Sequence, residues 1–123
     1  MTGQIDLTAP LFMIPVLTGS VFFLAGLVMH LFPPKKINML YGYRTKNSMK
    51  DQKRWDFAQD YSANKMMLYG GVFALSGIIG LVIKTDEMTG MYVGLGLMFL
   101  VVVLLLYSTE TAINKKFGKD RKV

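Results

Sequence analysis

Three uncharged apolar segments, each long enough to cross a lipid bilayer, constrain the fold of this chain most strongly. Leu11–Phe32 has 22 residues, Met66–Ile83 has 18 and Met88–Tyr107 has 20, and none of them contains Asp, Glu, Lys or Arg. A hydrocarbon core of about 30 Å needs roughly 20 apolar residues in helical conformation. Backbone groups in lipid must be paired within the segment, which favours helices. The sequence therefore predicts an all-α fold, a three-transmembrane-helix integral membrane protein, as a single domain over residues 1–123.

The distribution of basic residues predicts the orientation. Residues 33–65 carry eight of the 14 Lys and Arg residues, residues 108–123 carry five, and Lys84 is the remaining one. Because Lys and Arg are enriched in cytoplasmic segments, we expect the 33–65 loop and the C-terminus in the cytoplasm and the N-terminus outside. Residues 1–10 contain no Lys or Arg, so the first segment is expected to be a retained span and not a cleaved signal peptide.

Composition argues against several classes of function. The chain has no cysteine and one histidine, His30, which excludes thiolate sites and any site that needs two imidazoles from one chain. No glycine-rich phosphate loop or metal motif is present, so the sequence predicts no cofactor, no metal and no enzyme. The net charge is +6, and the basic residues flank the apolar segments. This placement favours binding to anionic lipid headgroups at the cytoplasmic face over binding to nucleic acid. The absence of charge inside the spans disfavours an ion-coupled pump.

Small residues occur at helical spacing in the second and third spans. The pairs Ser76-x-x-x-Gly80 and Gly90-x-x-x-Gly94 allow helix backbones to approach closely. The favoured interpretation is a hairpin in which these two spans pack on each other. Homo-oligomerisation is the alternative.

The stretch from Asn38 to Met49, with Trp55 six residues later, is polar, basic and aromatic. Pro33-Pro34 ends the first helix, because the residue before a proline disfavours helical geometry. Arg44 beside two tyrosines can grip a phosphate, or it can bind the carbonyl groups at the end of the first helix. Both uses remain open from the sequence.

A further helix is predicted between this stretch and the second span. Ser48 and Asp51 match the start of a capping box, so we expect the helix to run from Met49 to Asn64. Its apolar stripe is Trp55, Ala58, Ser62 and Met66. We therefore predict a cytoplasmic amphipathic helix that leads into the second span. It either lies on the membrane surface or continues directly into that span.

These residues also carry a resemblance to a known family. The matching positions are Gly42-Tyr43-Arg44-Thr45, Ser48, Trp55 and Ala58, with Gln59 where the family more usually has Asn. They resemble the signature of the SdpI/YfhL family of small bacterial membrane proteins. The resemblance implies a place in the bacterial cytoplasmic membrane, and immunity to a peptide toxin that attacks this membrane, by binding and not by catalysis. The functional patch it implies consists of Asn38, Tyr41, Gly42, Tyr43, Arg44, Thr45, Ser48 and Trp55.

Two other functions are compatible with the sequence. The first is an oligomeric small-solute or lipid-handling transporter, in which Arg44, Lys46 and the neighbouring tyrosines bind a phosphate headgroup. The second is a structural membrane subunit whose loop serves folding alone. The expected partners are therefore membrane lipids, a peptide toxin and a second copy of this chain.

Overall fold

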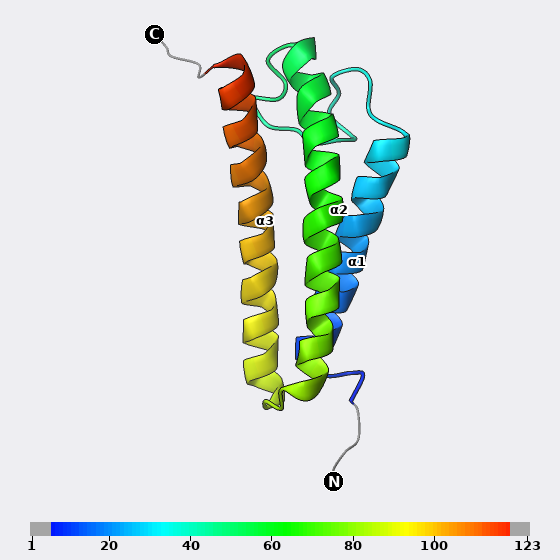
Figure 1. Ribbon diagram of the computed structural model, residues 1–123, viewed down its shortest axis with the longest axis vertical. Helices are drawn as coiled ribbons and strands as arrows, with labels where there is room; N and C mark the ends of the chain where they lie inside the picture. The colour runs from blue at the N-terminus through cyan, green and yellow to red at the C-terminus, as the bar shows by residue number, and fades with distance from the viewer. Residues whose placement is uncertain (1–5, 119–123) are drawn as a thin grey trace.

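The computed structural model describes residues 6–118 and contains three helices in this range, with no strand. They are α1, Pro10–Leu31, α2, Gln52–Val82, and α3, Glu87–Phe117 (Figure 1). All three are long and apolar enough to cross a membrane. The all-α prediction and the three spans are confirmed, and the predicted segments match the helices to within a residue except where α2 begins earlier and α3 ends later. Met1–Ile5, and three basic residues counted in the orientation prediction, Lys119, Arg121 and Lys122, lie outside the described residues.

The predicted start of α2 is wrong by three residues. Asp51 caps the helix, because its Oδ1 accepts a hydrogen bond of 2.8 Å from the backbone N–H of Arg54. This hydrogen bond is the main reason that the pKa of Asp51 lies below its ordinary value. Ser48 is not the cap. It lies in a turn before the helix, where its hydroxyl binds the loop backbone.

The amphipathic segment and the second span form one continuous helix of 31 residues. Of the two alternatives, the structure has the continuous one. Trp55, Ala58 and Ser62 are completely buried. The apolar stripe therefore faces the inside of the protein and not a membrane surface.

The closest helix pair is α1 with α2. The second and third spans also contact each other, but Gly80 and Gly94, which were predicted to join them, pack on α1 instead. A Cβ added at Gly70 would lie 2.6 Å from the carbonyl oxygen of Gly19, and one at Gly80 would lie 2.2 Å from that of Leu11. On α3, a Cβ at Gly94 would meet Ile14 of α1 at 2.9 Å. The small residues thus do mark close backbone approach, but the partner is α1. Spacing along one helix identifies a contact face and does not identify the helix that packs on it.

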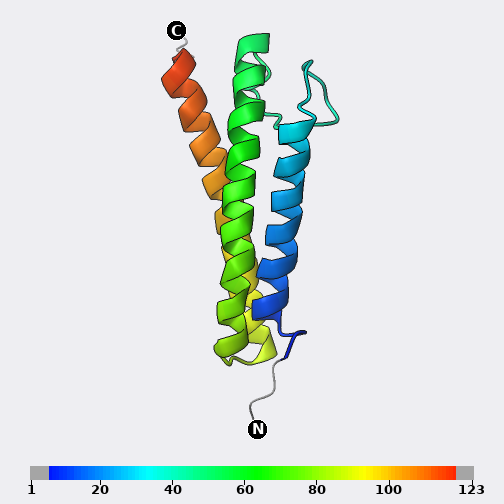
Figure 2. The same ribbon diagram turned by 45° about the vertical axis from the view of Figure 1, so that its right-hand side comes forward.

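The helices are arranged so that one end of the bundle carries the long loop and the other a short turn. Residues 32–51 cover the end near the carboxyl end of α3, while residues 83–86 join α2 to α3 at the opposite end. Figure 2 shows α1 alongside α2, and α3 tilting away from α2 toward its carboxyl end. Contacts between the loop and α3 therefore span the region where the helices diverge.

Candidate functional site

The loop between α1 and α2 is organised around Tyr43, which is 8% exposed. Its backbone N–H donates to Oε1 of Gln59 at 2.7 Å, and its carbonyl oxygen accepts from Nε2 of Gln59 at 2.8 Å. The Gln59 amide is 2% exposed, and it pairs with the loop backbone as a second strand would. Buried backbone groups that lack such partners are costly, so Gln59 fixes the position of this part of the loop on α2.

Glu110 connects the same loop to α3. Its Oε2 accepts hydrogen bonds from the hydroxyl of Tyr43 and from the hydroxyl of Thr45, both at 2.7 Å. One turn further along α3, Asn114 Oδ1 accepts from Nδ2 of Asn47 at 3.1 Å. Hydrogen bonds to a charged acceptor are stronger than neutral ones. The loop therefore joins two helices that diverge at this end.

Burial is the main reason that the pKa of Tyr43 is raised above its ordinary value. The hydrogen bond to Glu110 and the negative charge of its carboxylate raise the pKa further. A phenolate here would lose hydration and would face that carboxylate. Tyr43 is thus held as a neutral donor.

Ser48 closes the turn that follows Tyr43. Its Oγ accepts from the backbone N–H of Thr45 at 2.9 Å and lies 3.1 Å from the carbonyl oxygens of Tyr43 and Thr45. The backbone N–H of Ser48 in turn donates to Oγ1 of Thr45 at 3.1 Å. This reciprocal pairing satisfies local backbone groups as a side-chain turn does. Ser48 is fully buried and has a structural role in the loop.

Gly42 allows the loop to cross α2 closely. Its φ is +113°, and a Cβ at this position would lie 2.5 Å from Oε1 of Gln59 and 2.7 Å from Cγ of Pro34. Both the conformation and the space therefore require glycine. This glycine is a fixed point in the fold and not a flexible joint.

The first half of the loop is tied to the ends of α1 and α2. Trp55 is completely buried and donates from Nε1 to the carbonyl oxygen of Pro34 at 2.6 Å. The hydroxyl of Tyr41 donates to the carbonyl oxygen of Phe32, the residue that ends α1, also at 2.6 Å. Asn38 Oδ1 accepts from the backbone N–H of Tyr41 at 2.8 Å. These bonds leave little freedom between residues 32 and 43.

Arg44 does not bind the end of α1. Its guanidinium donates to the carbonyl oxygen of Met39 within the loop, and Tyr41 is the residue that binds the α1 terminus. Arg44 is exposed, next to a strongly exposed apolar tip in which Met39 is 69% and Leu40 is 91% exposed. We call Met39, Leu40 and Arg44 the loop edge. Of its three residues only Arg44 belongs to the predicted patch, and all three are open to another molecule.

The eight residues of the predicted patch thus fall into two groups. Six are buried or partly buried, namely Tyr43, Ser48, Trp55, Asn38, Gly42 and Thr45, and two are exposed, Tyr41 and Arg44. The predicted patch does not include the residues that bind its members, Gln59, which was identified only as a motif position, and Glu110. One signal was available for Glu110: it is an acid one turn beyond the third apolar segment, on the side of the bundle predicted to hold the loop's donors.

A cleft of about 400 Å³ lies between the end of α1 and the first turns of α2. His30, Lys35, Asp56 and Asp60 are among its lining residues. Within residues 6–118, no three His, Asp or Glu side chains lie close enough together to hold a metal ion. The cleft carries opposite charges on its two walls.

Comparison with known proteins identifies the family. The model of a family described as the SdpI/YfhL protein family matches residues 35–108, which include the loop after Pro34, all of α2 and most of α3, and end before Glu110 and Asn114. The chain is 49% identical over 61 residues to a protein named "Uncharacterized protein YfhL" from Bacillus subtilis (strain 168). That alignment covers 50% of this chain and 56% of the relative, about half the length of each. No solved structure matches the chain.

Proposed function

Because this chain belongs to the SdpI/YfhL protein family, we propose that it is an integral membrane protein that protects the bacterial cytoplasmic membrane against a membrane-active peptide. It acts by binding and not by catalysis. The loop edge is the contact surface, and the buried motif residues hold it in place.

The exposure of the loop edge is the observation that carries this proposal. Leu40 is 91% exposed although its own backbone N–H and that of Tyr41 both donate to Oδ1 of Asn38. An exposed apolar tip beside a cation suits a partner that is itself amphipathic. A peptide inserted in the membrane has this character. The edge belongs to the loop that follows α1 (Figure 1). In our proposal this loop lies near the bilayer surface, where such a peptide would emerge.

The proposed orientation has the loop and the C-terminus in the cytoplasm and the N-terminus outside, following the Lys and Arg distribution. A peptide that arrives from outside would then not meet the loop first. The loop edge would bind a peptide that has already inserted, and so prevent its assembly into a pore or remove it from the bilayer.

A challenge assay with matched variants tests the proposal. Cells that lack the gene, and cells that carry Arg44→Ala or Leu40→Asp, are exposed to a panel of membrane-active peptides, including peptides made by related strains. We expect both variants to lose resistance at wild-type abundance in the membrane. The matched control is Lys53→Ala, which removes an exposed charge from the first turn of α2. If deletion leaves sensitivity to every peptide unchanged, the proposal is wrong.

A further inference from the structure

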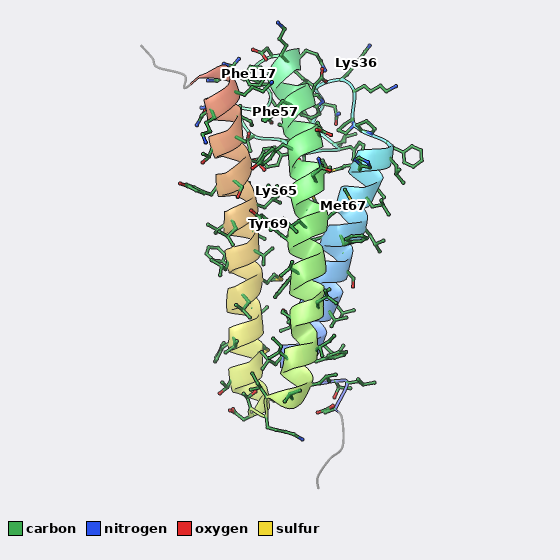
Figure 3. The ribbon with its side chains drawn as sticks, viewed as in Figure 1. Lys36, Phe57, Lys65, Met67, Tyr69 and Phe117 are labelled. Carbon is green, nitrogen blue, oxygen red and sulfur yellow. The ribbon has the colours of Figure 1, made fainter. Side chains whose placement is uncertain are left out.

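A second surface lies between α2 and α3, away from the loop edge. Four residues of α2 at a spacing of four, Phe57, Tyr61, Lys65 and Tyr69, form a ridge on one side of the helix. Figure 3 shows Phe57, Lys65 and Tyr69 between the two helices, with Phe117 at the end of α3. Residues four apart in a helix lie on one face. This ridge therefore follows the region where α3 diverges from α2.

Two contacts between α2 and α3 mark the ends of this region. Toward the middle of the bundle, the hydroxyl of Tyr69 lies 2.8 Å from Oγ of Ser108, so that one donates to the other. Near the carboxyl end of α3, the rings of Phe57 and Phe117 meet edge to face, with 5.8 Å between their centroids. An open cleft of about 690 Å³ lies against α3 here. Its lining residues are Tyr61, Tyr107, Ser108, Thr111, Ala112, Lys115 and Lys116.

The cleft carries cations that aromatic rings hold in place. The Nζ of Lys65 lies 5.4 Å from the centroid of the Tyr61 ring and 5.9 Å from that of Tyr69. The Nζ of Lys116 lies 5.5 Å from the Phe57 ring. Such contacts restrict lysines that would otherwise sample many rotamers. Lys115 and Lys116 therefore line the cleft, and Lys65 is held against the ring of Tyr61, the α2 residue that lines it.

The remaining polar groups of the cleft are neutral. Tyr61, Tyr107, Ser108 and Thr111 contribute hydroxyl groups that can donate hydrogen bonds. The only carboxylate on this part of α3 is Glu110, which accepts bonds from the loop hydroxyls. Two lining lysines and several hydroxyl donors, with Lys65 held against the lining Tyr61 and no Asp or Glu among the lining residues, suit an anion.

The position of the cleft indicates the source of that anion. Below it, α2 and α3 expose large apolar side chains, among them Leu68 at 52% and Leu104 at 42%. Tyrosines such as Tyr107, 69% exposed, are typical of the membrane–water boundary. Basic clefts between transmembrane helices at this depth bind acidic lipid headgroups.

We propose that the cleft between α2 and α3 is a binding site for the phosphate headgroup of an anionic glycerophospholipid. The phosphate lies between Lys65 and the Lys115–Lys116 pair. The acyl chains follow the exposed apolar faces of α2 and α3 into the bilayer. The lipid fills the space between diverging helices, and this role is independent of the loop edge.

Lipid titration followed by native mass spectrometry tests this site. The purified full chain, in a neutral detergent at about 150 mM salt, is titrated with phosphatidylglycerol and, separately, with phosphatidylcholine. The triple variant Lys65→Gln, Lys115→Gln and Lys116→Gln should bind phosphatidylglycerol on the order of 100-fold more weakly, since each lysine near an acidic lipid contributes about fivefold. Binding of phosphatidylcholine should be weak in both proteins.

Two further variants separate a built site from general attraction to positive charge. The control triple variant Lys36→Gln, Lys46→Gln and Lys53→Gln removes the same charge from exposed positions at the same end of the helix bundle. We expect its affinity to stay within about threefold of wild type, because these three lysines do not line the cleft and solvent screens their charges over the distance to it. Ala112→Trp keeps every charge and fills the cleft, so it should abolish binding. Emission from Trp55 in the charge variants, and thermal unfolding in Ala112→Trp, show that each protein is folded.

Three results would overturn the proposal. The first is equal loss of lipid in the two triple variants, which would mean general electrostatic attraction. The second is full retention of phosphatidylglycerol by Ala112→Trp. The third is lysine-dependent binding of inorganic phosphate or of an acidic peptide at the concentration at which phosphatidylglycerol binds, which would assign the cleft to a soluble ligand.

Discussion

Removal of the Glu110 carboxylate should release the loop from α3. Tyr43 and Thr45 each donate to Oε2 of Glu110 at 2.7 Å. A hydrogen bond to a charged group contributes about 1.5–3 kcal/mol net, and a buried hydroxyl left without a partner costs about 1–3 kcal/mol. Glu110 is only partly buried, so solvent places each bond at the low end of its range. We expect Glu110→Ala to cost about 2–4 kcal/mol against local opening of the loop.

Hydrogen exchange measured by mass spectrometry reads this opening directly. The backbone N–H groups of Tyr43, Thr45 and Ser48 all donate within the loop or to Gln59. An opening free energy lower by 2–4 kcal/mol corresponds to exchange that is about 30- to 700-fold faster at these amides. Amides in the middle of α2 should be unaffected.

Two variants make this prediction refutable. Glu110→Gln retains an acceptor oxygen and loses the charge, so it should cost about 1 kcal/mol. Glu87→Ala removes an exposed acid from the first turn of α3, at the far end of the helix, and should leave loop exchange unchanged. If Glu110→Ala accelerates the loop amides no more than Glu87→Ala does, then Glu110 does not hold the loop.

Three other predictions test the packing of the loop and the helices. The pKa of Tyr43 is raised in the folded protein, so the stability that its neutral form contributes is fully present below pH of about 10 and is lost as the pH rises further. Trp55 emission should show this loss in wild type and less of it in Tyr43→Phe. Gly70→Ala should destabilise by about 1–2 kcal/mol in thermal unfolding, because its Cβ meets α1 backbone atoms. Gly96→Ala, where no atom lies within 4 Å, should instead stabilise by up to about 1 kcal/mol. Gln59→Leu leaves the backbone N–H of Tyr43 unpaired, while its carbonyl oxygen keeps the Ser48 hydroxyl, so it should cost about 1–3 kcal/mol in the same measurement.

Helix positions could be predicted from the sequence because apolar length is a property of each segment alone. Charge-free runs of 18–22 residues leave few alternatives to a span, and the three runs correspond to α1, α2 and α3. The continuous α2 was also within reach, since no Gly or Pro interrupts residues 55–65. These features depend on local composition and not on the partner.

Helix pairing could not be predicted in the same way. Gly80 and Gly94 were predicted as close-approach positions, yet both meet α1. The choice between α1 and α3 depends on how Gly19 and the first turns of α1 complement α2, which is a property of two surfaces together. A short turn between α2 and α3 does not make them the closest pair.

The patch was predicted as a set of residues but not as a structure. The motif identified Tyr43, Ser48 and Trp55, and all three are buried in hydrogen-bond networks. The two side chains that bind Tyr43, Gln59 and Glu110, lie 16 and 67 residues from it along the chain. Contacts at such separations follow from the arrangement of the helices. The motif therefore marks mostly the support of the site, and the exposed loop edge emerges only from the fold.

Site-specific photo-crosslinking in living cells tests the central claim most directly. A photoreactive amino acid replaces Leu40, or as a control Leu75, which is 66% exposed on α2 near the middle of the bundle. Cells are then challenged with a tagged peptide to which deletion of the gene makes them sensitive. The account predicts a crosslink to the peptide from position 40 and little from position 75. A peptide captured at position 75 and not at position 40 would contradict the assignment of the loop edge as the contact surface.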